Sequence, residues 1–122
     1  MATAREDYKP KRRKLDDDLL QEIIRRIVEV ADPDRIILFG SAARGDMGPH
    51  SDVDLLVIKS GDYGQIDLTG QIYMNLFGVG HPVDVILVTP EYVDQYKDKP
   101  MLVIYPAMKE GKEVYVNPAL SA

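Results

Sequence analysis

The sequence predicts a single mixed α/β (α+β) domain in which helices flank a small sheet. Short apolar runs typical of strands alternate along the chain with longer segments whose apolar residues have helical spacing. Glycine and proline residues separate most of these segments, as expected for turns. The order helix, strand, helix, strand, helix, strand and further helices is typical of a mixed α/β domain. At 122 residues, the chain is long enough for one hydrophobic core.

The amino-acid composition is that of a soluble globular protein, with 45% apolar and 29% charged residues. Cysteine is absent, which excludes disulfides and thiolate metal sites. The formal charge of −5 argues against direct nucleic-acid binding, because such binding depends on cationic side chains that meet phosphates. No apolar run approaches the roughly 20 residues of a membrane span, and the N-terminus has no signal-peptide pattern. We therefore expect a cytoplasmic protein.

Residues 1–14 are polar and contain a cluster of basic side chains at Lys9 and at positions 11–14. Chain termini are usually loosely ordered. We therefore expect this segment to be a flexible basic tail and residues 15–122 to form the single domain. A contact for an acidic partner or for nucleic acid is the alternative interpretation of the basic cluster.

The first predicted helix spans Leu15–Ala31. Aspartates at positions 16–18 occupy its first turn, where carboxylates suit the positive end of the helix dipole. Apolar residues recur at three- and four-residue spacing and give the helix one apolar face. The segment Asp32-Pro33-Asp34 ends the helix, because the residue before a proline avoids the helical region.

Short apolar runs predict three buried strands, at Arg35–Phe39, Asp52–Ile58 and Pro82–Val88. Between the first two strands, a short helix begins at Gly40 and a glycine- and proline-containing loop follows it. A longer helix, Gln65–Phe77, connects the second and third strands and ends at two closely spaced glycines. Six of its residues are predicted to lie on one face of the helix: Ile66, Thr69, Ile72, Tyr73, Leu76 and Phe77.

The C-terminal third is predicted to contain shorter elements. Thr89 can cap a helix whose first position is a proline, where no helical hydrogen bond is lost. The predicted elements are a helix Pro90–Tyr96, a helix that begins at Ile104 or Tyr105 and ends at Glu110 before Gly111, and an edge strand Val114–Val116.

Asp52 and Asp54 are two residues apart on the second predicted strand. Side chains alternate between the two faces of a strand, so both carboxylates point to one face while Val53 and Leu55 point to the core. Adjacent anions repel each other unless a cation lies between them, and Mg²⁺ is a hard cation that takes carboxylate and phosphate oxygens. The pair therefore indicates a magnesium site, although alone it is also typical of a solvated strand end.

A third carboxylate, Asp84, interrupts the apolar run of the third strand. A charge in such a run is costly unless it is paired or bound to a metal. If the third strand lies beside the second, Asp84 can face the other two carboxylates, and the three together can hold two Mg²⁺ ions. Asp84 is then the expected ligand of the second ion or the acceptor of a proton from an attacking hydroxyl. A strand-end aspartate with a backbone partner is the alternative.

Gly40 and Ser41 stand where a strand ends and a helix starts, a position at which free backbone N–H groups bind phosphate. Gly40 permits a close approach of the phosphate to the backbone, and the Ser41 hydroxyl adds a donor. Arg44 either neutralises phosphate or pairs with an acidic neighbour. Ser51 belongs to the same predicted nucleotide-binding set, and we expect it to fix the loop next to Asp52. An ordinary N-capping serine is the alternative for Ser41.

The motif Gly40-Ser41, followed after ten residues by Asp52-Val53-Asp54, resembles the Gly-Ser-x10-Asp-x-Asp signature of the DNA polymerase β-like nucleotidyltransferase superfamily. The surrounding Phe-Gly-Ser-Ala-Ala-Arg-Gly and Ser-Asp-Val-Asp-Leu-Leu-Val are similar to the form seen in the minimal nucleotidyltransferases of bacteria and archaea. Asp84, in His-Pro-Val-Asp-Val-Ile, matches the third carboxylate of the family. The segment Ala-Met-Lys-Glu-Gly-Lys-Glu-Val-Tyr at 107–115 looks like the family's usual ending. The resemblance covers residues 15–116.

This resemblance implies the nucleotidyltransferase fold and the transfer of a nucleoside monophosphate, most often AMP from ATP, to a hydroxyl. It also implies two Mg²⁺ ions held by Asp52, Asp54 and Asp84, with the triphosphate at Gly40 and Ser41. Many such minimal proteins are antitoxins of helical HEPN toxins, and they adenylylate a toxin tyrosine or block the toxin by binding. A HEPN-type toxin is therefore the expected partner.

Two alternatives stay open at this point. The chain could be an antitoxin that acts by binding alone, without using its chemistry. It could also modify a small molecule such as an aminoglycoside, although larger relatives bind such acceptors with an added helical domain for which this chain has no room. The sequence leaves open whether the chain forms a homo-oligomer.

Overall fold

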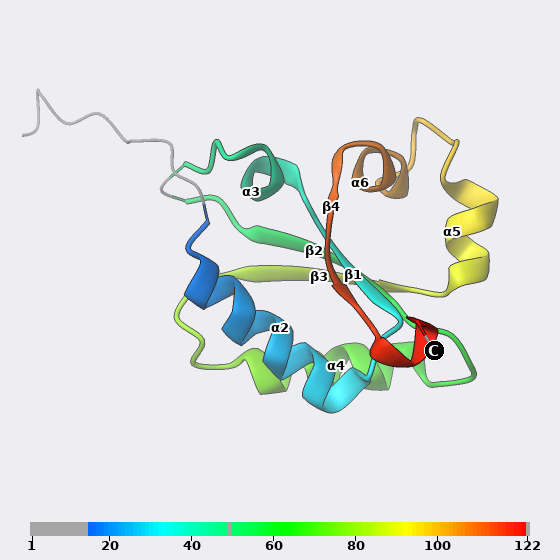
Figure 1. The fold of residues 1–122 in the computed structure, drawn as a ribbon, viewed down its shortest axis with the longest axis horizontal. Helices are drawn as coiled ribbons and strands as arrows, with labels where there is room; N and C mark the ends of the chain where they lie inside the picture. The colour runs from blue at the N-terminus through cyan, green and yellow to red at the C-terminus, as the bar shows by residue number, and fades with distance from the viewer. Residues whose placement is uncertain (1–14, 49, 122) are drawn as a thin grey trace, which may run out of the picture.

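The computed structural model describes residues 15–48 and 50–121 (Figure 1). The predicted basic tail, residues 1–14, lies outside the described residues. The described elements follow the predicted order. They are α2 Asp17–Ala31, β1 Arg35–Phe39, α3 Gly40–Arg44, β2 Val53–Ile58, α4 Gln65–Leu76, β3 Val83–Val88, α5 Pro90–Tyr96, α6 Ile104–Glu110, β4 Lys112–Val116 and the 3-10 helix η1 Pro118–Ser121.

The sheet has four strands in the order β3-β2-β1-β4. β1 pairs antiparallel with β2 and with β4, whereas β2 and β3 are parallel. Parallel neighbours need a crossover connection, which is usually a helix, and α4 supplies it here. The predicted small mixed sheet flanked by helices is therefore confirmed.

The hydrophobic core lies on both faces of the sheet. Figure 1 shows α2 and α4 on one face and α5 and α6 on the other. Buried residues form two matching clusters, one joining the sheet to α2 and α4 and the other joining it to α5 and α6. β2 contributes to both clusters, because the neighbouring side chains Leu55 and Leu56 point to opposite faces and are each 0% exposed.

α2 begins two residues later than predicted because Asp16 is its N-cap. The Asp16 carboxylate accepts hydrogen bonds from the backbone N–H groups of Asp18 (2.8 Å) and Leu19 (3.2 Å). The helix ends as predicted at Ala31, and Asp32 follows with a φ of 43°. Across residues 15–48 and 50–121, no helix has the length and apolarity needed to span a bilayer.

Replacing Asp16 with alanine is expected to lower the free energy of unfolding by about 1 kcal/mol, because two backbone donors at the start of α2 lose their acceptor. Asp16→Asn is the matched control, since asparagine caps helices about as well as aspartate. Urea unfolding curves of the two variants and the parent chain measure the difference. An equal loss of unfolding free energy in both variants would show that the negative charge of Asp16, and not its capping hydrogen bonds, stabilises the helix.

The face predicted for α4 differs in part from the face that is buried. Leu68, Ile72 and Leu76 pack into the core, and Leu68 is not among the residues predicted to share a face. Ile66 and Phe77, which are among them, are 87% and 86% exposed. The difference arises because α4 carries apolar side chains around most of its circumference, so helical spacing alone does not choose the face that meets α2 and the sheet.

The C-terminal elements agree closely with the prediction. Thr89 caps α5 by accepting a hydrogen bond from the Tyr92 N–H at 3.1 Å. α6 ends at Glu110, and the following Gly111 has an ordinary φ of −72°. Glycine is needed there for space, because a Cβ would overlap the Ala107 carbonyl oxygen and the Ile37 side chain. β4 is longer than the predicted three-residue strand, since its first two residues also pair with β1 beyond a register shift.

Candidate functional site

Asp54 and Asp84 are directly opposite each other in the parallel ladder of β2 and β3. This confirms the expectation that the third predicted strand lies beside the second. Val53 and Leu55, on either side of Asp54, are 0% exposed in the cluster with α2 and α4. Because side chains alternate along a strand, Asp54 and Asp84 point to the opposite face of the sheet. The register therefore brings the two carboxylates together at the start of both strands.

Asp52 lies one residue before β2 and is exposed, whereas Asp54 is half-buried. Burial raises the pKa of Asp54 above its ordinary value, and the negative charges of Asp84 and Asp52 raise it further. The Arg44 guanidinium has the opposite effect on this pKa. The three predicted carboxylates are thus close enough to repel one another. Burial and this repulsion both disfavour the ionised form of Asp54.

Gly40 brings the start of α3 against Asp54. Its φ of 73° lies in the left-handed region that glycine tolerates. A Cβ at this position would overlap the Asp54 carboxylate oxygen Oδ2. Ser41 follows as a half-buried residue in the first turn of α3, and no hydrogen bond from its hydroxyl occurs within residues 15–48 and 50–121. The glycine-serine turn and the carboxylates therefore form one site.

Arg44 has an acidic partner, as one of its two predicted roles required. Its Nε atom is 3.5 Å from Asp46 Oδ2, and both side chains remain largely exposed. The same guanidinium acts electrostatically on Asp54, so it also lies near the carboxylates. Its predicted contact with phosphate stays a prediction.

Ser51 fixes the loop in front of Asp52, as expected. Its Oγ accepts a hydrogen bond from the Gly48 N–H at 2.8 Å, and its own N–H donates to the Gly48 carbonyl at 3.3 Å. A ring nitrogen of His81 lies 3.1 Å from the Ser51 carbonyl oxygen. These contacts join the loop before β2 to the turn before β3. A direct contact of Ser51 with nucleotide stays a prediction.

Tyr73 is a member of the site that sequence reasoning missed. Its hydroxyl donates to Asp84 Oδ1 at 3.2 Å and accepts from the Val85 N–H at 2.8 Å. Burial and the nearby charges of Asp84 and Asp52 raise the pKa of Tyr73, and the hydrogen bond from Val85 opposes them. The sequence placed Tyr73 on an apolar helix face. The available signal was its position in the helix that leads to the strand of Asp84.

The residues of the site fit a magnesium ion that is shared with a substrate. Across residues 15–48 and 50–121, no three histidine, cysteine, aspartate or glutamate side chains are arranged to hold a metal by themselves. Mg²⁺ typically takes only one or two carboxylates together with substrate phosphates and waters. The in-register pair Asp54 and Asp84 is an all-oxygen donor set of this kind. Two ions held by all three carboxylates remain a prediction.

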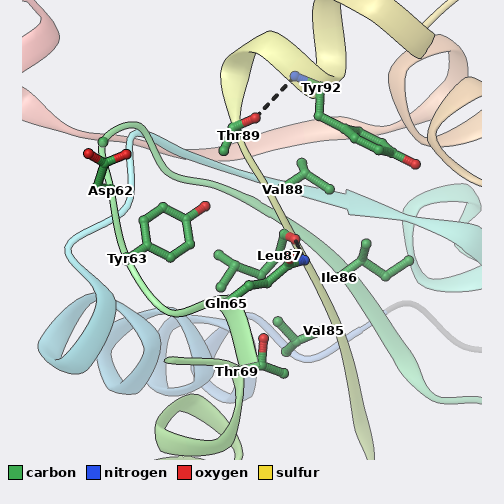
Figure 2. Close-up of a pocket in the computed structure, with 11 residues that line it drawn as sticks. Asp62, Tyr63, Gln65, Thr69, Val85, Ile86, Leu87, Val88, Thr89 and Tyr92 are labelled. Atoms are coloured by element: carbon green, nitrogen blue, oxygen red, sulfur yellow. Dashed lines mark hydrogen bonds between the residues drawn. The ribbon is translucent and has the colours of Figure 1, made fainter. Parts of the chain in front are cut away.

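A separate cleft of about 600 Å³ lies along the outer edge of β3, away from the three carboxylates. Figure 2 shows its walls, which come from the loop before α4, the first turns of α4, β3 and the start of α5. Gln65 crosses this edge and donates to the Leu87 carbonyl at 2.7 Å. The described residues that line this cleft include neither Gly40, Ser41 nor the three carboxylates, so the cleft is separate from the site that the motif residues form.

A family model described as a nucleotidyltransferase domain matches residues 18–110. This range contains Gly40, Ser41 and all three carboxylates, and it covers most of the chain. The chain belongs to the nucleotidyltransferase domain family. Nucleotidyl transfer is the activity that this membership supports.

The structural comparison agrees with the family. A crystal structure from Sulfolobus solfataricus, provisionally described as a nucleotidyltransferase, matches with a TM-score of 0.56 at 22% sequence identity. The match covers 81% of this chain and 78% of that one, and at this identity it shows a shared nucleotidyltransferase fold. A comparison with curated proteins finds no match.

Proposed function

We propose that this nucleotidyltransferase uses Mg²⁺ to transfer AMP from ATP to a hydroxyl of a partner protein, a tyrosine of a HEPN-type toxin. The observation that carries the proposal is the in-register pair of Asp54 and Asp84 beside the Gly40 turn. This arrangement supports the proposal, because two carboxylates can bind a divalent metal and they lie next to a glycine whose backbone lets a phosphate approach closely. The resemblance to minimal nucleotidyltransferases, many of which modify a helical toxin, favours a separate protein as the acceptor.

In the proposed reaction, Ser41 and the backbone at Gly40 bind the triphosphate, and Arg44 faces its negative charge. Asp52, Asp54 and Asp84 hold the metal ions. Bound magnesium stabilises the charge that develops on the phosphates and lowers the pKa of the attacking hydroxyl. The hydroxyl oxygen bonds to the α-phosphorus, the bond from that phosphorus to the β-phosphate oxygen breaks, and pyrophosphate leaves. The carboxylate of Asp84 takes the hydroxyl proton. Positioning and charge neutralisation supply the rate enhancement.

The test is incubation of the purified chain with labelled nucleoside triphosphates, Mg²⁺ and the protein encoded by the adjacent gene. Transfer of label from ATP to a tyrosine of that protein is expected, and tandem mass spectrometry identifies the residue. The Asp54→Asn variant is the negative control. The absence of transfer from every nucleoside triphosphate would overturn the proposal.

Neutralisation of a toxin by binding alone is the second candidate. The specific observation in its favour is that α4 exposes Ile66, Met74 and Phe77 by 77% or more, since exposed apolar patches mark protein contacts. Coexpression of the toxin with Asp54→Asn separates the two candidates. Full protection by this variant shows that the chemistry is dispensable, whereas loss of protection shows that transfer is needed.

Replacing Ser41 with alanine is expected to raise the KM for ATP by about ten- to a hundredfold. A hydrogen bond to a charged group contributes about 1.5–3 kcal/mol, and about 1.4 kcal/mol corresponds to a factor of ten. Steady-state kinetics with varied ATP measures the change. Ser60→Ala is the matched control, because that hydroxyl bonds Asp34 at 3.0 Å at the far end of β2. An unchanged KM in Ser41→Ala would remove this serine from the triphosphate site.

A further inference from the structure

Tyr73 reaches the carboxylate site from the other side of the sheet. It belongs to α4, which packs on the face opposite to the side chains of Asp54 and Asp84. β3 is an edge strand, so the tyrosine can pass its open edge. There its hydroxyl meets both the backbone of Val85 and the side chain of Asp84. The contact therefore links the crossover helix to the third carboxylate.

The hydrogen bonds of Tyr73 have a defined direction. The Val85 N–H donates to the tyrosine oxygen at 2.8 Å, which anchors the oxygen at the strand edge. The single hydroxyl proton can then point to Asp84 Oδ1 at 3.2 Å, or to the Val85 carbonyl at 3.4 Å. A bond to a carboxylate is the stronger of the two. Tyr73 therefore holds one oxygen of an otherwise exposed carboxylate and leaves the other oxygen for a ligand.

We propose that Tyr73 is a positioning residue that orients the Asp84 carboxylate toward a divalent metal shared with Asp54. This rests on the proposed function only in so far as Asp84 is a metal ligand. Partners that orient a ligating carboxylate typically contribute a factor of 10–100 in metal affinity or activity. Removal of the Tyr73 hydroxyl is therefore expected to weaken metal binding about tenfold, with the fold intact because the ring remains.

The experiment measures the binding of Mn²⁺, a spectroscopic substitute for Mg²⁺, to the full chain in the presence of a non-hydrolysable ATP analogue. Electron paramagnetic resonance gives the free Mn²⁺ concentration for the parent chain and for Tyr73→Phe. Tyr63→Phe is the matched control, because its hydroxyl donates at 3.0 Å to the Lys59 carbonyl at the other end of the sheet. The expected result is weaker binding in Tyr73→Phe alone.

A double-mutant cycle with Asp84→Asn shows whether Tyr73 acts through Asp84. If it does, Tyr73→Phe has no further effect on Mn²⁺ binding in the Asp84→Asn background. A purely structural role would lower the melting temperature of both tyrosine variants and leave the metal affinity unchanged, which would overturn the proposal. The proposal would also be overturned if Tyr73→Phe weakened Mn²⁺ binding by the same factor in the Asp84→Asn background as in the parent chain.

A measurement on the unmodified chain keeps the test independent of folding in the variants. Mn²⁺ is expected to broaden the NMR signals of the Tyr73 ring far more than those of Tyr63, since only Tyr73 contacts a proposed ligand. Equal broadening would contradict the proposal. None of these measurements uses an acceptor. If the chain fails to modify a partner protein, the Mn²⁺ affinities can still be measured and interpreted. If Tyr73 does not affect Mn²⁺ binding, the assays of protein modification are unaffected.

The outer surface of α4 carries a second, independent inference. Ile66, Met74 and Phe77 are 87%, 77% and 86% exposed, and Tyr73 is 39% exposed. These positions recur at helical spacing on the side opposite to Leu68 and Ile72. Soluble proteins rarely expose several large apolar side chains together unless the patch binds a partner. We call these four exposed residues the α4 stripe.

The charged side chains of the chain segment that carries the α4 stripe are all acidic. From Ser60 to Tyr96 the chain has no lysine or arginine. It has five carboxylates in the same segment, at Asp62, Asp67, Asp84, Glu91 and Asp94. One cation from α2, Arg26, also reaches the end of the stripe, where it donates to the Phe77 carbonyl at 3.0 Å, but it is already paired with Glu22 at 2.7 Å. A partner seated on the stripe therefore needs apolar side chains flanked by cationic ones, because complementary charge favours association and like charge opposes it.

We infer that the α4 stripe is the docking surface for the acceptor protein, which presents an apolar ridge flanked by lysine and arginine. This inference rests on the proposed function. It follows from continuity with the site, since Tyr73 belongs to the stripe and also contacts Asp84. A protein on this surface can reach the carboxylates around the open edge of β3, the edge that Tyr73 passes to contact Asp84.

Two synthetic amphipathic helical peptides test the charge rule, one with lysine and one with glutamate flanking the same leucine ridge. Fluorescence anisotropy at low salt is expected to show binding of the lysine peptide only. Met74→Lys is expected to weaken that binding at least tenfold. Met101→Lys is the control, because Met101 is 92% exposed outside the stripe. Equal effects of the two variants, or a preference for the glutamate peptide, would overturn the inference.

A second copy of the chain is the competing occupant of the stripe. Sedimentation across a range of concentrations shows whether the parent chain dimerises, and whether Met74→Lys abolishes the dimer. A dimer that depends on Met74 would overturn the assignment to an acceptor. The peptide assay uses no nucleotide, so Asp54→Asn is expected to bind the lysine peptide as the parent chain does, which separates docking from chemistry.

Discussion

Replacing Asp54 with asparagine is expected to abolish nucleotidyl transfer and yet to stabilise the folded chain. Asparagine has nearly the same shape but no negative charge to bind a cation. The loss of one preorganised electrostatic contact at a reacting centre typically lowers kcat by about 10²–10³, and a loss at least that large is expected here. Activity is measured with labelled ATP and the partner protein.

The stabilising effect follows from the electrostatics of the folded chain without metal. Burial raises the pKa of Asp54, and Asp84 and Asp52 raise it further. A group whose pKa is higher in the folded state is penalised when it is ionised. Asparagine removes that penalty. Thermal unfolding at neutral pH without metal is therefore expected to show a higher melting temperature for Asp54→Asn than for the parent chain.

The pH dependence has a definite sign. Because the folded state holds its proton on Asp54 more tightly than the unfolded chain does, stability falls as pH rises from the ordinary aspartate pKa through the raised value. The gap in melting temperature between Asp54→Asn and the parent chain should therefore close as pH falls below about 4. A gap that is independent of pH would contradict this explanation. Asp98→Asn, at an exposed position after α5, is the matched control.

The strands and most of the helix ends could be predicted from the sequence because local chemistry determines them. β1 and α5 have the predicted bounds, since Asp32-Pro33-Asp34 and the Thr89-Pro90 pair limit them. α2 begins later than predicted because the Asp16 side chain caps it. Which of the three aspartates becomes the cap depends on the backbone angles. The edge position of β4 was predicted, but its extra pairing with β1 depends on a distant strand.

The site was predictable to the extent that it rests on a motif and on strand periodicity. Asp54 and Asp84 were expected to meet only if their strands were neighbours, and the parallel ladder supplies that condition. For Tyr73 the sequence offered only its position in the helix before the strand of Asp84, and this does not show that the side chain reaches past the edge of β3 to that carboxylate. The buried face of the same helix differs from the predicted apolar face, since apolar residues surround the helix and tertiary packing chooses among them.

Replacing Gly40 with alanine is expected to lower activity far more than stability, and Gly78→Ala is the matched control. Both glycines have left-handed backbone angles, with φ of 73° and 84°, so alanine at either position costs about 1–2 kcal/mol. A Cβ at Gly78 meets no atom of the described residues within 4 Å, whereas at Gly40 it overlaps Asp54 Oδ2.

The two variants should therefore separate conformational cost from displacement of the carboxylate. The Asp54 side chain can rotate away from an alanine Cβ at little energetic cost, so urea unfolding should show similar losses in Gly40→Ala and Gly78→Ala. Rotation takes the carboxylate out of register with Asp84, so only Gly40→Ala should lose transfer and Mn²⁺ binding. If Gly40→Ala keeps full activity, close contact between the glycine turn and Asp54 is not required for the chemistry. If Gly78→Ala loses as much activity as Gly40→Ala, backbone strain explains both losses, and displacement of the Asp54 carboxylate does not.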